Sequence, residues 1–335
     1  RLSAMGDVAM TVPVVAAVLR QNPSVKITVV TRKAFIPLFH GLEVEFVVPD
    51  LYGEHKGIMG LYRLFKEINS ITTWDAVLDL HDVLRSKILR TFFKLYGIPT
   101  FHIDKGRKEK KALTSKVKME FKQLKHTTER YAAVFRSPGF EVDLALPNEK
   151  KSRFSIAESL ANVLGEKTQP WIGVAPFAQH QQKMYPIEKM YAVINLLSEK
   201  GFRIFVFGGG DQEKVLANDL CKNNEQATNL IGQYALIEEL GLLNEMDAVL
   251  SMDSANMHMA AMTNTKVVSI WGATHPYAGF AGFGHNQDHF IQIPETELSC
   301  RPCSVFGNKP CFRGDFACMN QISPESIVQK IESSL

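Results

Sequence analysis

The sequence lacks a long uninterrupted run of apolar residues. Residues 267–284 come nearest, because they contain no Asp, Glu, Lys or Arg, but four glycines and one proline interrupt them. A helix that crosses a bilayer needs about 20 predominantly apolar residues. No secretory signal is visible either, since Asp7 ends the first apolar stretch. We therefore expect no membrane-spanning segment and no signal peptide.

An excess of charge of one sign is also missing. Lys and Arg number 38 against 35 Asp and Glu, which gives a formal net charge of +3. So mild a balance argues against nucleic acid as the main partner. The 335 residues are 45% hydrophobic and 22% charged, values typical of globular proteins rather than of disordered chains or fibres. At roughly 150 residues per domain, the length predicts two domains.

Three common signs of a nucleotide or metal–diphosphate site are absent. The sequence contains neither G-x-G-x-x-G nor G-x-x-x-x-G-K-[ST], so a nicotinamide site and a P-loop are not supported. It also contains no Asp-x-Asp, the usual sign of a divalent-metal diphosphate site. Any diphosphate would therefore have to be bound by other groups.

Short β-rich runs alternate with helical patterns, which predicts parallel sheets covered by helices on both faces. The opening RLSAMGD lacks a strand before its glycine turn, and we expect a few native residues to precede it. Residues 147–169 read as the linker between two such units. The predicted strands are 25–31, 43–48, 76–80, 171–175, 203–207, 247–252 and 266–271, and the predicted helices are 10–19, 59–70, 187–200, 255–262 and 324–333. The economical architecture is two doubly wound domains with a ligand cleft at the carboxyl ends of the strands.

Two loops of the second half could bind an anion. The triple glycine at 208–210 follows a strand and precedes a helix, where backbone amides can approach phosphate, although such glycines often serve only the turn. The sequence MDSANMHMAA at 252–261 ends a strand at Asp253 and opens a helix with small or polar residues. Ordinary helix capping explains it as well as an anion site does. WGATHP at 271–276 then adds a second polar, glycine-bearing loop at the same edge.

Two charged side chains could act in catalysis. Lys183, in the loop after a strand, could neutralise the charge of a departing diphosphate or could be an ordinary surface lysine. Asp7 is the only carboxylate in the first turn of its unit, where it could be a general base or simply a helix-start carboxylate. Residues 105–125 hold nine Lys or Arg against two Glu. They could form a solvated face or a basic lip for an anionic substrate or membrane surface.

Four of the five cysteines lie close together near the end of the chain. Cys300, Cys303, Cys311 and Cys318 follow the pattern C-x2-C-x7-C-x6-C, while Cys221 stands apart. The spacing permits a tetrahedral zinc site, and a reduced thiol cluster in a compact loop is the alternative. We expect the cluster to lie away from Asp7 and to have a structural role.

Taken in order, RLSAMGDVAMTVPVV, LDLHDVLRS, QQKMYP, DSANMHMAA, WGATHP and the cysteine-rich end resemble glycosyltransferase family 9, whose best-known members are the ADP-heptose:lipopolysaccharide heptosyltransferases. The resemblance spans essentially the whole chain. It implies the α/β GT-B fold with two facing Rossmann-like domains, and inverting, metal-independent transfer. The implied organisation is an acceptor-binding domain at 1–155, a nucleotide-sugar-binding domain at 165–322, and a helix at 323–335 that returns to the first domain.

The resemblance also assigns roles to residues. It implies Asp7 as the base and Lys183 as the diphosphate lysine. The implied donor-binding residues are Gly208, Gly209, Asp253, Ser254, Ala255, Asn256, His258, Gly272 and Thr274. The implied acceptor-binding residues are Ser3, Met5, Gly6, Arg63, Arg85 and Lys87. The chain departs from the family pattern at Ala178, Gln179, Ala255 and Asn256, which bears on the donor sugar.

These observations lead to one expected function and two rivals. We expect transfer of heptose from ADP-heptose to an anionic, lipid-linked inner-core acceptor of lipopolysaccharide, in the cytoplasm and with peripheral contact at the inner membrane. No cofactor is expected to be required, and the cysteine spacing permits a structural zinc. The rivals are a transferase that uses another nucleotide-sugar such as a UDP-hexose, and a nucleotide-sugar-binding protein without catalysis.

Overall fold

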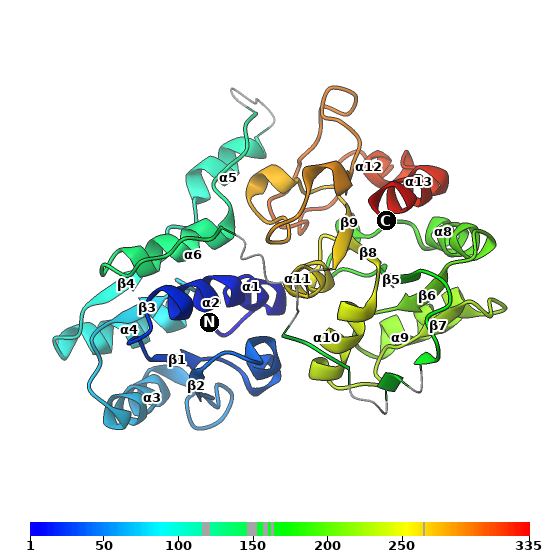
Figure 1. Cartoon of the computed structure of the whole chain (residues 1–335). Helices are drawn as coiled ribbons and strands as arrows, with labels where there is room; N and C mark the ends of the chain where they lie inside the picture. The colour runs from blue at the N-terminus through cyan, green and yellow to red at the C-terminus, as the bar shows by residue number, and fades with distance from the viewer. Residues whose placement is uncertain (116–120, 146–152, 157–159, 162–163, 264) are drawn as a thin grey trace. The chain divides into compact units, whose positions relative to one another are not determined.

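The computed structural model describes residues 1–115, 121–145, 153–156, 160–161, 164–263 and 265–335. The chain divides into two compact units, which Figure 1 colours by residue number. Unit 1 comprises Arg1–Lys105 and Thr127–Pro147, and unit 2 comprises Gly106–His126 and Asn148–Leu335. The predicted first domain ends at residue 155, close to the boundary between the units after Pro147. Residues 146–152 and 157–159, on either side of residue 155, lie outside the described ones.

One segment belongs to a different unit from the one predicted. Residues 106–126 lie inside the predicted amino-terminal domain but are part of unit 2. Leu113 and Leu124 are buried against Ala278, and the Leu124 N–H donates to the Tyr277 carbonyl at 2.9 Å. The basic run is not simply a solvated face either, because Lys110 is buried and its Nζ lies 4.0 Å from the centroid of the Phe280 ring. These apolar and cation–π contacts decide the assignment.

Unit 1 contains two short parallel sheets and the helices that cover them. β1 pairs with β2, and β3 pairs with β4, both in parallel. The elements are α1 (Met5–Ala9), α2 (Val12–Gln21), β1 (Ile27–Val30), η1 (Lys33–Phe39), β2 (Val44–Val47), α3 (Gly57–Ile71), β3 (Val77–Asp79), α4 (Leu84–Leu95), β4 (Thr100–His102) and α6 (Thr127–Arg136). The helix predicted over 10–19 is α2, displaced by two residues at each end, and Pro13 suits its first turn, where a missing N–H costs no hydrogen bond. The short helix α1 precedes it and was not predicted.

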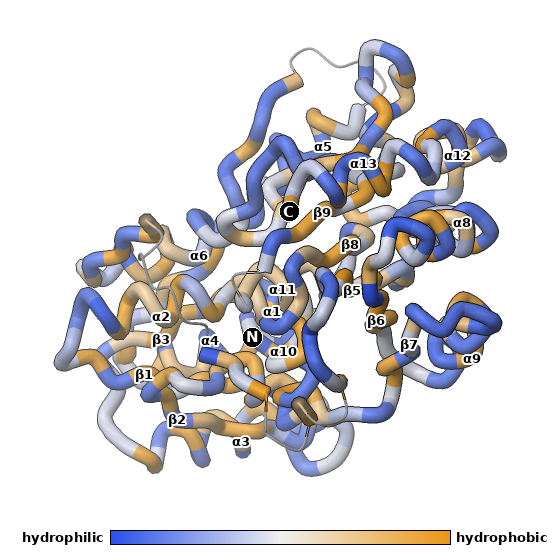
Figure 2. Tube along the Cα trace, turned by 45° about the vertical axis from the view of Figure 1, so that its right-hand side comes forward, coloured by the Kyte–Doolittle hydropathy of each residue, from blue (hydrophilic) through white to orange (hydrophobic). Residues whose placement is uncertain are grey.

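Unit 2 is built on one parallel sheet of six strands in the order β7-β6-β5-β8-β9-β10. This is the strand order of a Rossmann fold, 3-2-1-4-5-6. The strands are β5 (Trp171–Ala175), β6 (Arg203–Val206), β7 (Ala227–Asn229), β8 (Ala248–Met252), β9 (Lys266–Ile270) and β10 (Phe290–Ile291). All residues of β5 and β8 are buried, as expected where helices cover both faces of a parallel sheet. Figure 2 shows hydrophobic residues along these strands.

The helices of unit 2 follow the strands in alternation. Met190, Val193 and Leu197 of α8 are fully buried in the same core as the strands. The helices are α5 (Arg107–Leu113), η2 (Gln181–Lys183), α8 (Ile187–Glu199), α9 (Asp211–Cys221), α10 (Leu236–Glu245), α11 (Ala255–Met262), η3 (Pro276–Ala278), η4 (Gln287–His289), α12 (Ala317–Asn320) and α13 (Pro324–Ser334).

The carboxyl-terminal helix differs from its prediction in its packing but not in its extent. We predicted that it would return to the amino-terminal domain, yet α13 lies in unit 2 and packs on α8, β8 and β9. Ile327, Val328 and Ile331 are buried in the core of that unit. This apolar stripe explains the location, since each fully buried aliphatic side chain contributes about 1.5–3 kcal/mol.

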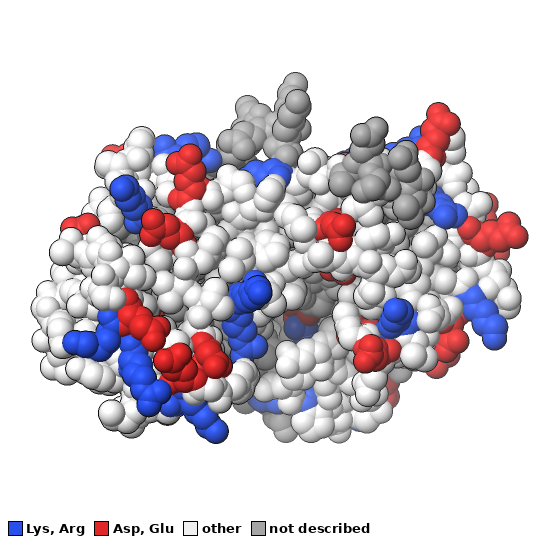
Figure 3. Space-filling view, turned by 90° about the horizontal axis from the view of Figure 1, so that it is seen from below, with Lys and Arg blue, Asp and Glu red and all other residues white. Residues whose placement is uncertain are grey.

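The surface and helix lengths agree with the composition. Within the described residues, none of the helices combines the length and the apolar character that a membrane span requires. Figure 3 shows Lys and Arg interspersed with Asp and Glu on the face it presents, without a large field of one sign. This distribution fits the net charge of +3.

Candidate active site

The strand order of unit 2 places a topological switch point between β5 and β8. The chain leaves β5 towards β6 and leaves β8 towards β9, in opposite directions along the sheet. The loops that follow the two strands therefore diverge, and ligands of doubly wound proteins bind at this switch point. Lys183 lies in η2 after β5, and Asp253 follows β8 directly.

Lys183 and Asp253, both predicted from the sequence, form an ion pair at this point. Lys183 Nζ lies 3.0 Å from Asp253 Oδ2, and the side chains are only 15% and 8% exposed. Gly307, at φ +75°, packs against the aliphatic part of Lys183, where a Cβ would collide with Cγ and Cδ. The pair thus presents a fixed cation that is screened little by water.

The start of α11 offers a second element of an anion site. Ser254 is the N-cap, but its side chain makes no capping hydrogen bond; its Oγ lies 3.3 Å from Ser251 Oγ. The amides of the first turn, which includes Ala255 and Asn256, carry the partial positive charge of a helix N-terminus. An anion bound there would lie beside Asp253 and hence beside its partner Lys183.

The loop after β9 approaches the same place. The Ala273 N–H donates to the Gln182 carbonyl at 3.2 Å, and a Cβ at Gly272 would lie 2.9 Å from that oxygen. Glycine is therefore required for this approach. Thr274 Oγ1 is buried and makes no hydrogen bond to the described residues. Such an atom is costly unless a ligand or water satisfies it, which suits the predicted donor-binding role of Thr274.

Arg301 holds this loop and was missed by the sequence analysis. It is 1% exposed and donates to the carbonyls of Gly272 at 2.7 Å, Trp271 at 2.9 Å and Thr274 at 3.1 Å. Its guanidinium suits this task, because it has five donors in a fixed geometry. The only sequence signal was its place between Cys300 and Pro302 in the cysteine-rich end.

The triple-glycine loop has a geometry that does not favour phosphate. The Gly209 N–H donates to Glu213 Oε2 at 2.8 Å, and a Cβ at Gly208 would collide with Ile231 and with that carboxylate. Burial raises the pKa of Glu213. Close packing explains Gly208, and the Gly209 N–H is occupied by its hydrogen bond to Glu213, so the predicted role of these glycines in donor binding stays a prediction.

Two further groups of unit 2 bear on the site. His258, predicted to bind the donor, is buried on α11. Glu239 was not predicted: it lies in the first turn of α10, and burial raises its pKa to about 7. Because α10 follows β7, this half-buried carboxyl lies towards the same edge of the sheet. A carboxyl poised near neutral pH is typical of functional sites, but nothing in the sequence distinguished Glu239 from the adjacent Glu238.

In unit 1, Asp7 lies in α1 and is 29% exposed. Arg1 Nη2 lies 2.5 Å from Asp7 Oδ2, and Arg1 Nη1 donates to the Leu80 carbonyl at 2.6 Å. The Ala4 N–H also points at Oδ2, at 3.4 Å. Asp7 is therefore oriented by the residues before it and still reached by solvent, as a general base must be. Met5 and Gly6 lie beside it in the same helix.

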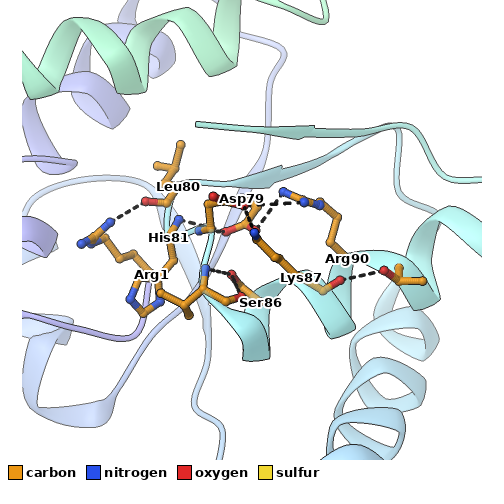
Figure 4. A network of polar contacts seen from close by, with 10 residues as sticks. Arg1, Asp79, Leu80, His81, Ser86, Lys87 and Arg90 are labelled. Carbon is orange, nitrogen blue, oxygen red and sulfur yellow. Dashed lines mark hydrogen bonds and ion pairs between the residues drawn. The ribbon is translucent and has the colours of Figure 1, made fainter. Parts of the chain in front are cut away.

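A polar network next to Asp7 follows β3 (Figure 4). Asp79 Oδ1 accepts from the N–H groups of His81 and Asp82 at 2.9 and 2.8 Å, and its Oδ2 lies 3.1 Å from Arg90 Nη1. Lys87 Nζ lies 3.5 Å from Asp82 Oδ1. Burial and, to a smaller extent, the nearby Arg1 charge lower the pKa of His81 to about 4, so this imidazole stays neutral at neutral pH.

The predicted acceptor residues are only partly brought together. Ser3 Oγ lies 3.3 Å from His81 Nε2, and Lys87 joins the network through Asp82. Arg63 lies on α3, where it donates to the Glu54 carbonyl at 3.1 Å. Arg85 lies in the first turn of α4. His81 was missed as a candidate, although it stands in the motif LDLHDVLRS.

The four clustered cysteines line one cavity, together with Arg301 and Gln182. The Cys303 N–H donates to the Ala273 carbonyl at 3.1 Å, so the cavity adjoins the loop described above. All four thiols are half-buried and free. Burial raises the pKa of Cys318 to about 11 and also raises that of Cys303. Without a metal, the Cys303 and Cys318 thiols stay protonated at neutral pH.

Another group of side chains that could bind a metal ion lies in unit 1. Among the described residues, Glu54, His55 and Glu67 have ligand atoms within 4.8 Å of one another, and the four thiols are more widely spaced. His55 Nδ1 accepts from the Asp50 N–H at 3.0 Å, so its Nε2 carries the proton that faces Glu67 at 3.0 Å. Both ring nitrogens are thus used in structure, and this group is not a metal site.

The sequence and the fold were compared with known proteins. The chain is 23% identical over 309 residues to lipopolysaccharide heptosyltransferase 1 of Escherichia coli O18:K1:H7, covering 89% of this chain and 92% of that protein. Matches to lipooligosaccharide heptosyltransferase 2 of two Campylobacter jejuni strains are 25% identical and span 44% of the length of those relatives.

Solved structures show the same GT-B fold over the whole chain. A family 9 glycosyltransferase from Veillonella parvula matches with a TM-score of 0.73 and 18% identity, covering 100% of this chain and 95% of that one. E. coli heptosyltransferase WaaC with ADP matches with a TM-score of 0.69 and 20% identity, covering 100% and 98%. The sequence model of the family described as glycosyltransferase family 9 (heptosyltransferase) matches residues 61–305. The chain therefore belongs to glycosyltransferase family 9 and is a glycosyltransferase.

Proposed function

We propose that this enzyme transfers heptose from ADP-heptose to an inner-core lipopolysaccharide acceptor, with inversion and without a catalytic metal. The buried Lys183–Asp253 pair beside the uncapped start of α11 carries this proposal. A fixed cation and helix amides at a Rossmann switch point suit a departing diphosphate. The WaaC structures with ADP and with ADP-2-deoxy-2-fluoro heptose support the choice of donor.

In the proposed reaction, the Asp7 carboxylate takes the proton of the acceptor hydroxyl. The freed oxygen attacks the anomeric carbon as the bond between that carbon and the diphosphate oxygen breaks. The electron pair of that bond leaves with ADP, and Lys183 and the Ser254–Asn256 amides stabilise the added negative charge. A single displacement of this kind inverts the anomeric configuration.

The acceptor proposal rests on the basic groups of α4, which follows β3. Arg85 and Lys87 lie in the first turn of α4, and α4 contains four basic residues and no acidic one. Such a helix suits an acceptor that carries phosphates or acidic sugars. We place the reaction in the cytoplasm, with the lipid-linked acceptor at the inner membrane.

Mass spectrometry of the lipopolysaccharide core from a deletion strain tests the function. We expect the core to lose a heptose and everything attached to it, and a core of unchanged mass would contradict the proposal. Thermal shifts of the purified protein separate the rivals. Stabilisation by UDP but not ADP would favour the UDP-hexose transferase, and stabilisation by ADP with an unchanged core would favour a binding protein.

We further propose that Cys300, Cys303, Cys311 and Cys318 hold a structural metal such as zinc. Their shared cavity and the thiolate chemistry of zinc fit this role, although the sulfur atoms must approach one another and release protons on binding. The metal would brace the segment that presses Gly307 against Lys183. It supplies no step of the transfer.

Replacing one of these cysteines should lower stability more than turnover. For Cys318→Ser we expect loss of the bound metal and a lower melting temperature, with turnover per folded molecule within about threefold of wild type. Cys221→Ser, which changes a half-buried thiol on α9 outside the cavity, is the control. Metal content and melting curves give the readout. A metal whose removal abolished activity and left the melting temperature unchanged would contradict the structural role.

A further inference from the structure

The segments that follow β1, β2 and β3 emerge at one edge of unit 1. β1 and β2 are parallel, and the Thr31 N–H donates to the Val47 carbonyl at 3.1 Å. Arg1 bridges the ends of β1 and β3, because its amino group donates to the Val30 carbonyl and its side chain to the Leu80 carbonyl. The same Arg1 contacts Asp7, so this is the edge of the proposed acceptor site.

Large apolar side chains on these segments are exposed to solvent. Tyr52 is 77% exposed, Ile58 63%, Met59 69% and Leu84 76%. We call these four residues the apolar rim. Tyr52 follows β2, Ile58 and Met59 begin α3, and Leu84 begins α4. Single exposed apolar residues are ordinary, but several at one edge mark a surface that binds something.

Basic residues surround the apolar rim. Residues 31–34, 48–63 and 80–87 contain six Lys or Arg against three acidic residues. The acidic ones are largely engaged: Asp50 accepts from the backbone of its own turn, and Asp82 is paired with Lys87. Arg32 Nη2 donates to the Tyr52 hydroxyl at 3.4 Å, which places a cation beside an amphipathic ring. Aromatic rings of this kind favour the boundary between water and lipid.

We propose that the apolar rim docks on the surface of an anionic lipid bilayer. Exposed apolar side chains flanked by Lys and Arg match the acyl boundary and the negative headgroups of such a surface. The location gives docking a purpose, which rests on the proposed function: a lipid-linked acceptor would be presented at the edge that carries Asp7. A second copy of the chain or a protein partner matches this edge less well, because neither supplies a continuous negative charge beside an apolar layer.

Flotation of the full chain with vesicles tests the proposal. Vesicles of phosphatidylcholine alone are compared with vesicles that also contain phosphatidylglycerol. The matched variants are Leu84→Ser and Leu95→Ser, because these residues are the first and last of α4 and are both 76% exposed. They lie about 16 Å apart along the helix, and only Leu84 is at the proposed edge. Met59→Ser provides a second variant of the rim.

We expect wild type to bind only the anionic vesicles, and high salt to weaken binding. Leu84→Ser and Met59→Ser should each weaken it about tenfold, which is the expected effect of withdrawing one large apolar side chain from lipid. Leu95→Ser should bind like wild type. Equal loss in Leu95→Ser, or equal binding to neutral vesicles, would overturn the proposal. So would a dimer, seen by size exclusion, that the rim variants dissociate while vesicle binding stays the same.

Transfer to a deacylated, water-soluble acceptor separates this proposal from the proposed function. Leu84→Ser should transfer to it at the wild-type rate, since the variant changes docking alone. If wild type transfers heptose but does not bind anionic vesicles, the docking proposal fails and the function stands. If wild type binds the vesicles through the rim but transfers nothing to either acceptor, the proposed function fails.

Discussion

Asp7→Asn should lower kcat by about 10²–10⁴-fold, the usual contribution of a positioned general base. The amide has nearly the shape of the carboxylate but cannot take the proton of the acceptor hydroxyl. We expect the KM for the donor to stay near its wild-type value, because the proposed donor site lies in unit 2. Steady-state kinetics with a saturating acceptor gives both constants.

The variant should remain folded, which makes this loss interpretable. The amide oxygen of the Asp7→Asn side chain can still accept a hydrogen bond from Arg1, and a pair in which Asp7 is 29% exposed contributes at most about 1 kcal/mol to stability. Asp75→Asn is the control, because Asp75 is an exposed carboxylate just before β3 in the same unit. Wild-type turnover in Asp7→Asn at saturating donor would show that another group is the base.

Lys183→Met should reduce both stability and turnover. The change leaves the Asp253 carboxylate 8% exposed and without its cation, and breaking a buried pair in this way costs about 3–5 kcal/mol. Loss of the charge that faces the diphosphate should lower kcat per folded molecule by about 10²–10³-fold. Denaturant unfolding and single-turnover transfer measure the two effects separately.

Two further variants separate catalysis from folding. The double variant Lys183→Met with Asp253→Asn removes the unpaired charge, so stability should recover in part while turnover stays low. Lys167→Met is the matched control, because Lys167 also lies 3.0 Å from an aspartate, Asp247, but both side chains are 36% exposed. We expect it to lose at most about 1 kcal/mol and no activity. Recovery of turnover in the double variant would show that Lys183 is structural.

The local pattern of the sequence was enough to locate the strands and helices that frame the site. The predicted strand 171–175 and helix 255–262 coincide with β5 and α11, and 247–252 differs from β8 by one residue. Buried strands of a parallel sheet are continuous apolar runs, and a small or polar residue at a strand end begins the next helix. These signals are local, so they could be read without knowing the fold.

Contacts between distant residues could not be read in this way. Lys183 and Asp253 were each predicted, but their pairing across 70 positions follows from the adjacency of β5 and β8 in the sheet. The roles of Arg301 and Glu213 depend on which carbonyls and amides the folded chain brings to them. The type of a side chain determines whether it can donate or accept a hydrogen bond, but it does not determine which group becomes its partner.

The sequence by itself determined the class of fold, the extent of the main elements and the family resemblance. The tertiary structure decided that residues 106–126 and α13 belong to unit 2. It also decided that Gly272 packs against the Gln182 carbonyl, whereas Gly208 packs against Ile231 and the Glu213 carboxylate. The physical reason is that periodicity and capping act over a few residues, whereas burial depends on the surface against which an apolar stripe is finally packed.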